Sequence, residues 1–101
     1  MKFFIGISGF TLDMGQCRSL KEKRQLLRSI TSRIANQKVM GVCEAGGRDS
    51  WKSAFLAVAC VSGSYRGAQE CISTARRIIE GSGAEVIEQE SRVVGSEDLS
   101  G

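Results

Sequence analysis

Short apolar runs alternate along the chain with longer segments whose apolar positions recur every three to four residues. Residues 3–12 (FFIGISGFTL) and 52–62 (KSAFLAVACVS) are apolar or small on both alternations, which is typical of central strands. Residues 38–45 (KVMGVCEA) also have the pattern of a strand, and residues 84–94 (AEVIEQESRVV) alternate with one polar side. The pattern therefore predicts four strands.

Two amphipathic helices separate these strands. Ser19 and Glu22 form an S-x-x-E capping box, which predicts a helix from Ser19 to about Asn36. A second helix is predicted after Gly63 and Ser64, and the glycines of residues 81–83 end it. The apolar positions predicted for the inner faces are Leu20, Leu27, Ile30 and Ile34 in the first helix, and Ala68, Cys71, Ile72, Ala75, Ile78 and Ile79 in the second.

The order strand-helix-strand-strand-helix-strand predicts an α+β ferredoxin-like sandwich. In this arrangement a four-stranded antiparallel sheet of order 4-1-3-2 carries both helices on one face, with right-handed crossovers. The first and third strands are then central, in agreement with their apolar character. We expect one domain over residues 1–94 and a flexible C-terminal tail over residues 95–101.

The helices leave the other face of this sheet uncovered. Phe4, Phe10 and either Leu56 with Val58 or Phe55 with Ala57 are expected on that face. An exposed apolar sheet face usually marks an interface. We therefore expect a homo-oligomer, most simply a dimer, that uses this face or an edge strand.

Charge is distributed unevenly along a chain of ordinary composition. The chain of 101 residues has a net charge of +3, but residues 18–38 carry seven basic side chains against Glu22 alone. This asymmetry predicts a surface that attracts anions. The N-terminal apolar run is interrupted by Gly6, Ser8 and Gly9 and is too short to span a bilayer, so we expect a first strand there and no contact with a membrane.

The four cysteines and the absence of histidine restrict the possible chemistry. There is no C-x-x-C pair, so the usual zinc spacings are missing, and no metal site is expected. No glycine-rich phosphate cradle precedes a helix, so no cofactor is expected, and no catalytic residue can be assigned. Cys43, Cys60 and Cys71 fall within apolar patterns and are expected in the core, whereas Cys17 in a connection is the expected reactive thiol.

The first helix begins with the basic segment RSLKEKR, residues 18–24. Cations near a helix N-terminus oppose the helix dipole, so helix formation does not explain them. One interpretation is a solvated basic face, and the other is an anion-binding site. Lys23 falls within the apolar face, where its ammonium must reach toward the helix end. The candidate nucleic-acid-binding residues are Arg18, Lys21, Lys23, Arg24, Arg28 and, on the neighbouring hairpin, Trp51.

The hairpin EAGGRDSW, residues 44–51, should lie beside this helix start. Glu44 and Asp49 are candidates for a structural ion network with Lys23, Arg18 or Arg24. Alternatively the cations remain available and Trp51 offers a stacking surface for a base. The sequence leaves both interpretations open.

The combination of RSLKEKR after a first strand with CEAGGRDSW before a third strand resembles the YlxP-like family of small bacterial proteins, the domain of unknown function 503. The resemblance covers about residues 1–94. It implies a ferredoxin-like fold and a cytoplasmic protein encoded among genes for transcription elongation, translation initiation and ribosome maturation. It implies no established enzymatic activity.

Three functional hypotheses follow. The first is a non-enzymatic accessory protein that binds RNA or the ribosome through the basic helix. The alternative is a homo-oligomeric structural or protein-interaction module whose basic motif forms internal ion pairs. An enzyme is the third, with Cys17 as the candidate nucleophile, and it requires chemistry that the chain itself does not display.

Overall fold

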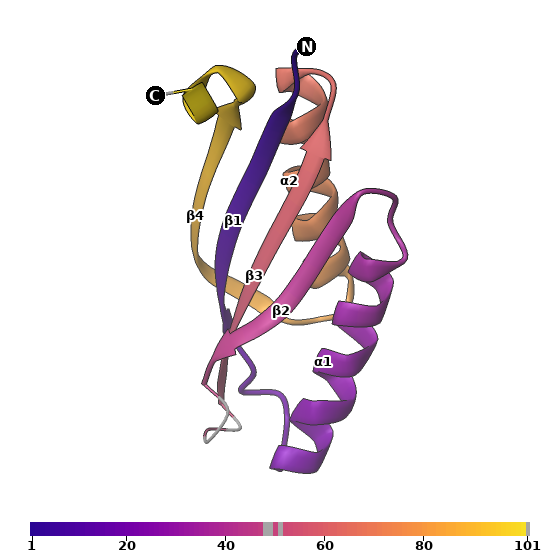
Figure 1. The fold of residues 1–101 in the computed structure, drawn as a ribbon. Coiled ribbons are helices and arrows are strands. Elements are labelled where there is room, and N and C mark those ends of the chain that lie inside the picture. Colours follow the sequence, from indigo (N-terminus) through magenta and orange to yellow (C-terminus); the bar gives the residue numbers. More distant parts are fainter. Residues whose placement is uncertain (48–49, 51, 101) are drawn as a thin grey trace.

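The computed structural model describes residues 1–47, 50 and 52–100 and confirms the predicted topology. Two helices lie behind a four-stranded antiparallel sheet of order β2-β3-β1-β4, which is 4-1-3-2 read from the other edge (Figure 1). The elements are β1 (Phe4–Asp13), α1 (Leu20–Ala35), β2 (Met40–Gly46), β3 (Ser53–Ser62), α2 (Tyr65–Gly81), β4 (Glu85–Gly95) and the 3-10 helix η1 (Ser96–Ser100).

A serine caps the N-terminus of each α-helix. The Ser19 hydroxyl accepts a hydrogen bond from the Glu22 backbone N–H at 3.2 Å, and Ser64 accepts one from Gly67 at 3.0 Å. Such caps satisfy amides that the helix itself cannot pair. The reciprocal half of the α1 capping box is shifted by one residue, because the Glu22 carboxylate accepts from the Arg18 N–H at 3.3 Å and not from Ser19.

The core lies between the sheet and the two helices. Alternate residues of the central strands supply it, such as Phe10 and Leu12 on β1 and Leu56 and Val58 on β3. The helices contribute the periodic apolar residues expected from the sequence: Leu27, Ile30 and Ile34 on α1, and Ala68, Ile72, Ala75 and Ile79 on α2.

The side of the sheet on which two phenylalanines lie differs from the sequence expectation. Phe10 is paired with Leu56 and is only 1% exposed, so it belongs to the core and not to the uncovered face. Phe4 lies on the same alternation and contacts the Tyr65 ring of α2 edge-on, with the ring centroids 6.0 Å apart. Because both alternations of β1 are apolar, hydrophobicity alone could not decide which one faces the helices.

The uncovered face, called the open face below, carries the other alternation of each strand. Of the two alternatives predicted for the third strand, Phe55 and Ala57 lie on the open face, whereas Leu56 and Val58 are buried on the helix side. Ile7 is 47% exposed and Val61 is 50% exposed on this face. The open face is therefore apolar over the two central strands, as predicted, but with different residues on β1.

The segment after β4 is hydrogen-bonded to the start of the chain. The Ser96 N–H donates to the Phe3 carbonyl at 2.9 Å, and the Ser96 hydroxyl accepts from the Phe3 N–H at 3.2 Å. Residues 96–100, predicted as part of a flexible tail, thus begin with a two-point attachment to the residue that precedes β1.

Candidate anion-binding surface

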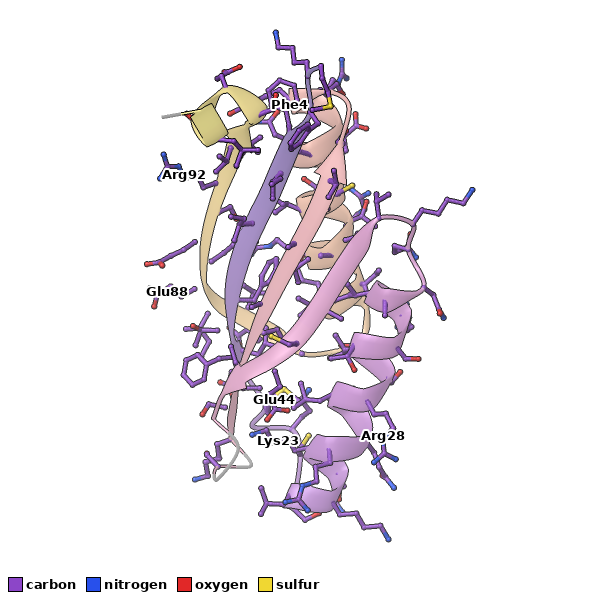
Figure 2. All side chains as sticks on the ribbon, in the orientation of Figure 1. Phe4, Lys23, Arg28, Glu44, Glu88 and Arg92 are labelled. Atoms are coloured by element: carbon purple, nitrogen blue, oxygen red, sulfur yellow. The ribbon has the colours of Figure 1, made fainter. Side chains whose placement is uncertain are left out.

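Four cations of the basic segment and the first helix lie on the solvent side of α1. We call Arg18, Lys21, Arg24 and Arg28 the basic surface, and all four residues are exposed. Three of them lie three or four positions apart on α1, so they form a stripe along it. Figure 2 shows Arg28 projecting from the outer side of this helix.

No side chain of the basic surface has an ion pair or hydrogen-bond partner within the described residues. The one acidic residue of α1, Glu22, lies at the helix start, where its carboxylate accepts a hydrogen bond from the Arg18 backbone N–H. Two of the three arginines of α2 are arranged differently. Arg66 pairs with Glu70 at 3.2 Å, and Arg76 pairs with Glu80 at 3.4 Å, each one turn along the helix. Positive charge on α1 is therefore concentrated and uncompensated on its own helix.

A groove of about 400 Å³ runs between α1 and the edge strand β2. Arg24, Arg28 and Thr31 line it from the helix, and Val42 and Glu44 are among the residues that line it from the strand. Thr31 is not among the residues predicted from the sequence, although its spacing of three from Arg28 continues the same stripe. Two cations of the basic surface, Arg24 and Arg28, therefore border a partly enclosed groove, whereas Arg18 and Lys21 do not line it.

Lys23 has a different position from the other four cations. It is 2% exposed, and its Nζ atom donates hydrogen bonds to the backbone carbonyls of Gly47 and Ser50. The helical pattern correctly placed it on the apolar face. Because its ammonium is buried and hydrogen-bonded to the β2–β3 hairpin, we assign Lys23 a structural role and do not include it in the anion-binding surface.

The proposed ion network and stacking surface involve the same hairpin. Glu44 lies on β2, close to α1 in the groove, and Figure 2 shows it on the strand beside the helix that carries Lys23 and Arg28. Asp49 and Trp51 lie outside the described residues. The ion network of Glu44 and Asp49, and base stacking by Trp51, therefore stay predictions.

Two cysteines occupy places opposite to those expected. Cys17 is buried at 6% exposure, and burial together with the nearby Glu22 carboxylate raises the pKa of its thiol, against a smaller lowering by Lys23. Cys43, expected in the core, is exposed on β2. A protonated, enclosed thiol is a poor nucleophile, so Cys17 is not suited to the catalytic role that its position in the sequence suggested.

Groups of three or more residues able to hold a metal ion are absent from the described part of the chain. Among the helices of that same part, none has both the length and the apolar character needed to cross a bilayer.

The fold and topology place the chain in the ferredoxin-like class of α+β proteins. A family model described as "Protein of unknown function (DUF503)" matches residues 5–91, and the chain belongs to this family. This confirms the resemblance to domain of unknown function 503. No curated protein matches the chain.

Solved structures share the architecture at low sequence identity. The structural-genomics protein YjcS is 6% identical with a TM-score of 0.55, and the match covers 87% of this chain and 96% of that one. A dimeric ferredoxin-like protein of unknown function from Thermobifida fusca is 14% identical with a TM-score of 0.49, covering 92% and 90%. A Nitrosomonas europaea protein described as a putative antibiotic biosynthesis monooxygenase is 8% identical with a TM-score of 0.49, covering 93% and 89%.

Proposed function

We propose that this chain is a cytoplasmic, non-enzymatic accessory protein that binds RNA through the basic surface of α1. The observation that carries the proposal is the contrast between the helices. Two of the three arginines of α2 pair with glutamates one turn away, and the third, Arg77, donates to the Thr74 hydroxyl. The side chains of Arg18, Lys21, Arg24 and Arg28 have no such partner in the described residues. Exposed, uncompensated cations in a stripe are the usual footprint of a surface that contacts phosphates.

The position of the stripe supports the same proposal. The first turn of α1 has a positive dipole end, and Lys21 adds charge of the same sign there. This arrangement lowers the stability of the isolated helix by a few tenths of a kcal/mol per cation. An external polyanion would convert this unfavourable potential into a favourable interaction, because helix amides and side-chain cations then act together.

The groove between α1 and β2 adds a place for more than phosphate. The two arginines supply hydrogen-bond donors on one wall, where the Thr31 hydroxyl already donates to the Leu27 carbonyl and can only accept. On the other wall Val42 supplies an apolar contact beside the Glu44 carboxylate. Single-stranded RNA is recognised through both its backbone and its unstacked bases. The genomic context implied by the YlxP-like resemblance favours ribosomal RNA as the partner.

The test compares two double variants that change the net charge by the same amount. Lys21→Glu with Arg28→Glu reverses the centre of the basic surface, and Arg66→Glu with Arg77→Glu reverses two exposed cations of α2. Binding to a fluorescent single-stranded ribosomal RNA fragment is expected to weaken by at least about tenfold in the first variant only.

The same experiment separates the structural interpretation. If the basic surface acts through internal ion pairs, the α1 double variant should lose thermal stability and keep whatever RNA affinity the wild type has. Equal RNA affinity of both double variants and the wild type would contradict the proposal.

The second candidate function is a homo-oligomeric interaction module. The observation that favours it is the open face, where Ile7, Phe55 and Val61 expose between 38% and 50% of their surface on neighbouring central strands. Contiguous exposed apolar surface of this kind marks an interaction site more often than a solvated face. The two functions are compatible, because the basic surface lies on the helix side of the sheet.

A further inference from the structure

The open face contains a hollow and, beside it, an exposed apolar side chain that could fill such a hollow in another copy. A hollow of about 190 Å³ lies over Gly9, with walls that include Thr11, Phe55, Ala57 and Glu90. It exists because Gly9 has no side chain, and a Cβ built there would have no atom within 4 Å. An engineered cavity of about 150 Å³ accommodates benzene, so this hollow can accommodate a branched aliphatic side chain. The exposed Ile7 is the next residue of β1 on the same face.

The strand register arranges the open face in rows that run across the sheet. Directly paired residues share a face, so each residue of β1 has one neighbour on β3 and one on β4. The four rows, written in the order β3, β1, β4, are Val61–Ile5–Val94, Ala59–Ile7–Arg92, Ala57–Gly9–Glu90 and Phe55–Thr11–Glu88.

These rows are self-complementary. A two-fold axis that crosses the strands midway between the Ile7 row and the Gly9 row brings each of these rows over the other in a second copy. Ile7 then enters the hollow at Gly9 of the other copy, and Ala59 lies over Ala57. Arg92 lies over Glu90 of the other copy, so one charge pair forms on each side of the axis.

The next rows outward bring apolar side chains together on β3, whereas on β4 Val94 lies over Glu88 of the other copy. Val61 lies over Phe55 of the other copy, and the exposed apolar side chains of β3 cover one another. Figure 2 shows Arg92 and Glu88 along the outer edge of β4, which places the charged groups at the rim of this arrangement. An apolar centre with a charged rim is the usual composition of a specific interface.

The available area is compatible with such an assembly. Strands about 4.8 Å apart that rise about 3.3 Å per residue give a sheet face on the order of 600 Å² for each copy. Two such faces bury on the order of 1,200 Å², at the lower end of the range for specific interfaces.

We propose that the open face binds a second copy of this chain in a symmetric dimer, with Ile7 in the Gly9 hollow and Arg92 paired with Glu90 across the axis. This inference specifies the second candidate function and does not rest on RNA binding. Residues of α1 are not part of the interface, so the RNA-binding variants of α1 should remain dimers.

Analytical ultracentrifugation at about 10 μM tests the hollow. The wild type is expected to sediment as a dimer and Gly9→Phe as a monomer, because a Cβ at this position meets no atom within 4 Å and the ring beyond it occupies the hollow that Ile7 of the other copy requires. The control Ser73→Phe places the same ring on an exposed position of α2 and should remain a dimer. A monomeric wild type or a dimeric Gly9→Phe would overturn the inference.

A charge exchange tests the pairing without altering the core. Arg92→Glu alone should increase the fraction of monomer, because it opposes Glu90 of the other copy. Adding Glu90→Arg to the same chain should restore the dimer. All variants should keep the circular dichroism spectrum of the wild type, which excludes misfolding as the cause. Failure of the double variant to restore the dimer would refute the proposed axis.

Discussion

The ammonium of Lys23 donates a hydrogen bond to the backbone carbonyl of Gly47 and so joins the buried side of α1 to the β2–β3 hairpin. A second bond, to the Ser50 carbonyl, gives the ammonium two acceptors in the same hairpin. The two parts of the chain that carry the family resemblance are therefore in direct contact. One lysine of the basic segment positions the hairpin, while its neighbours face solvent.

Replacing Lys23 by methionine should destabilise the protein by about 1–3 kcal/mol, because two carbonyls lose their buried donor while the side-chain volume is nearly kept. Lys21→Met is the matched control on the exposed side of the helix and should change stability by less than about 0.5 kcal/mol. Urea unfolding followed by circular dichroism measures both. Equal midpoints for the two variants would show that the Lys23 contacts contribute nothing to stability.

A second close contact holds α2 against the sheet. A Cβ at Gly6 would lie 2.9 Å from the Cys60 Sγ atom and 3.1 Å from the Ala68 carbonyl oxygen. Gly6→Ala should therefore force α2 away from β1 and cost about 1–3 kcal/mol of unfolding free energy. Gly41→Ala, where a Cβ meets nothing within 4 Å, is the control and should be as stable as the wild type. A fully stable Gly6→Ala would contradict this packing.

Cys17 should make stability fall at alkaline pH. Its folded-state pKa is raised above the ordinary value of 9.0, so the unfolded chain loses the thiol proton at lower pH than the folded chain does. Stability from this group is complete below pH 9 and is lost as pH rises toward the folded-state pKa.

The measurement is the unfolding free energy of wild type and Cys17→Ala between pH 8 and pH 10.5. The wild-type value should fall more steeply with pH, by up to about 1.4 kcal/mol per pH unit for this thiol. Parallel pH dependences would show that Cys17 ionises equally well in both states.

Most of the fold could be predicted because periodicity and caps carry it. Residues 3–12 correspond to β1 at Phe4–Asp13, and the helix predicted from Ser19 to Asn36 corresponds to α1 at Leu20–Ala35. The order of elements then limited the sheet to one familiar topology, which the structure confirms.

The features that could not be predicted depend on tertiary contacts without a sequence signature. Phe10 was placed on the wrong face because both alternations of β1 are apolar. The burial of Cys17 and the exposure of Cys43 follow from the same difficulty, since cysteine fits either environment. Lys23 was placed on the apolar face, but its partners are backbone carbonyls, which any residue provides.

The salt dependence of RNA affinity tests the central claim most directly. The dissociation constant for the ribosomal RNA fragment is measured between 50 and 300 mM KCl for the wild type and for Lys21→Glu with Arg28→Glu. If both cations contact phosphates, the logarithmic salt slope of the variant should be smaller by about 1.4 to 1.8, since each contact contributes about 0.7 to 0.9. Identical slopes, or wild-type binding that does not respond to salt, would contradict the account of α1 as an RNA-binding surface.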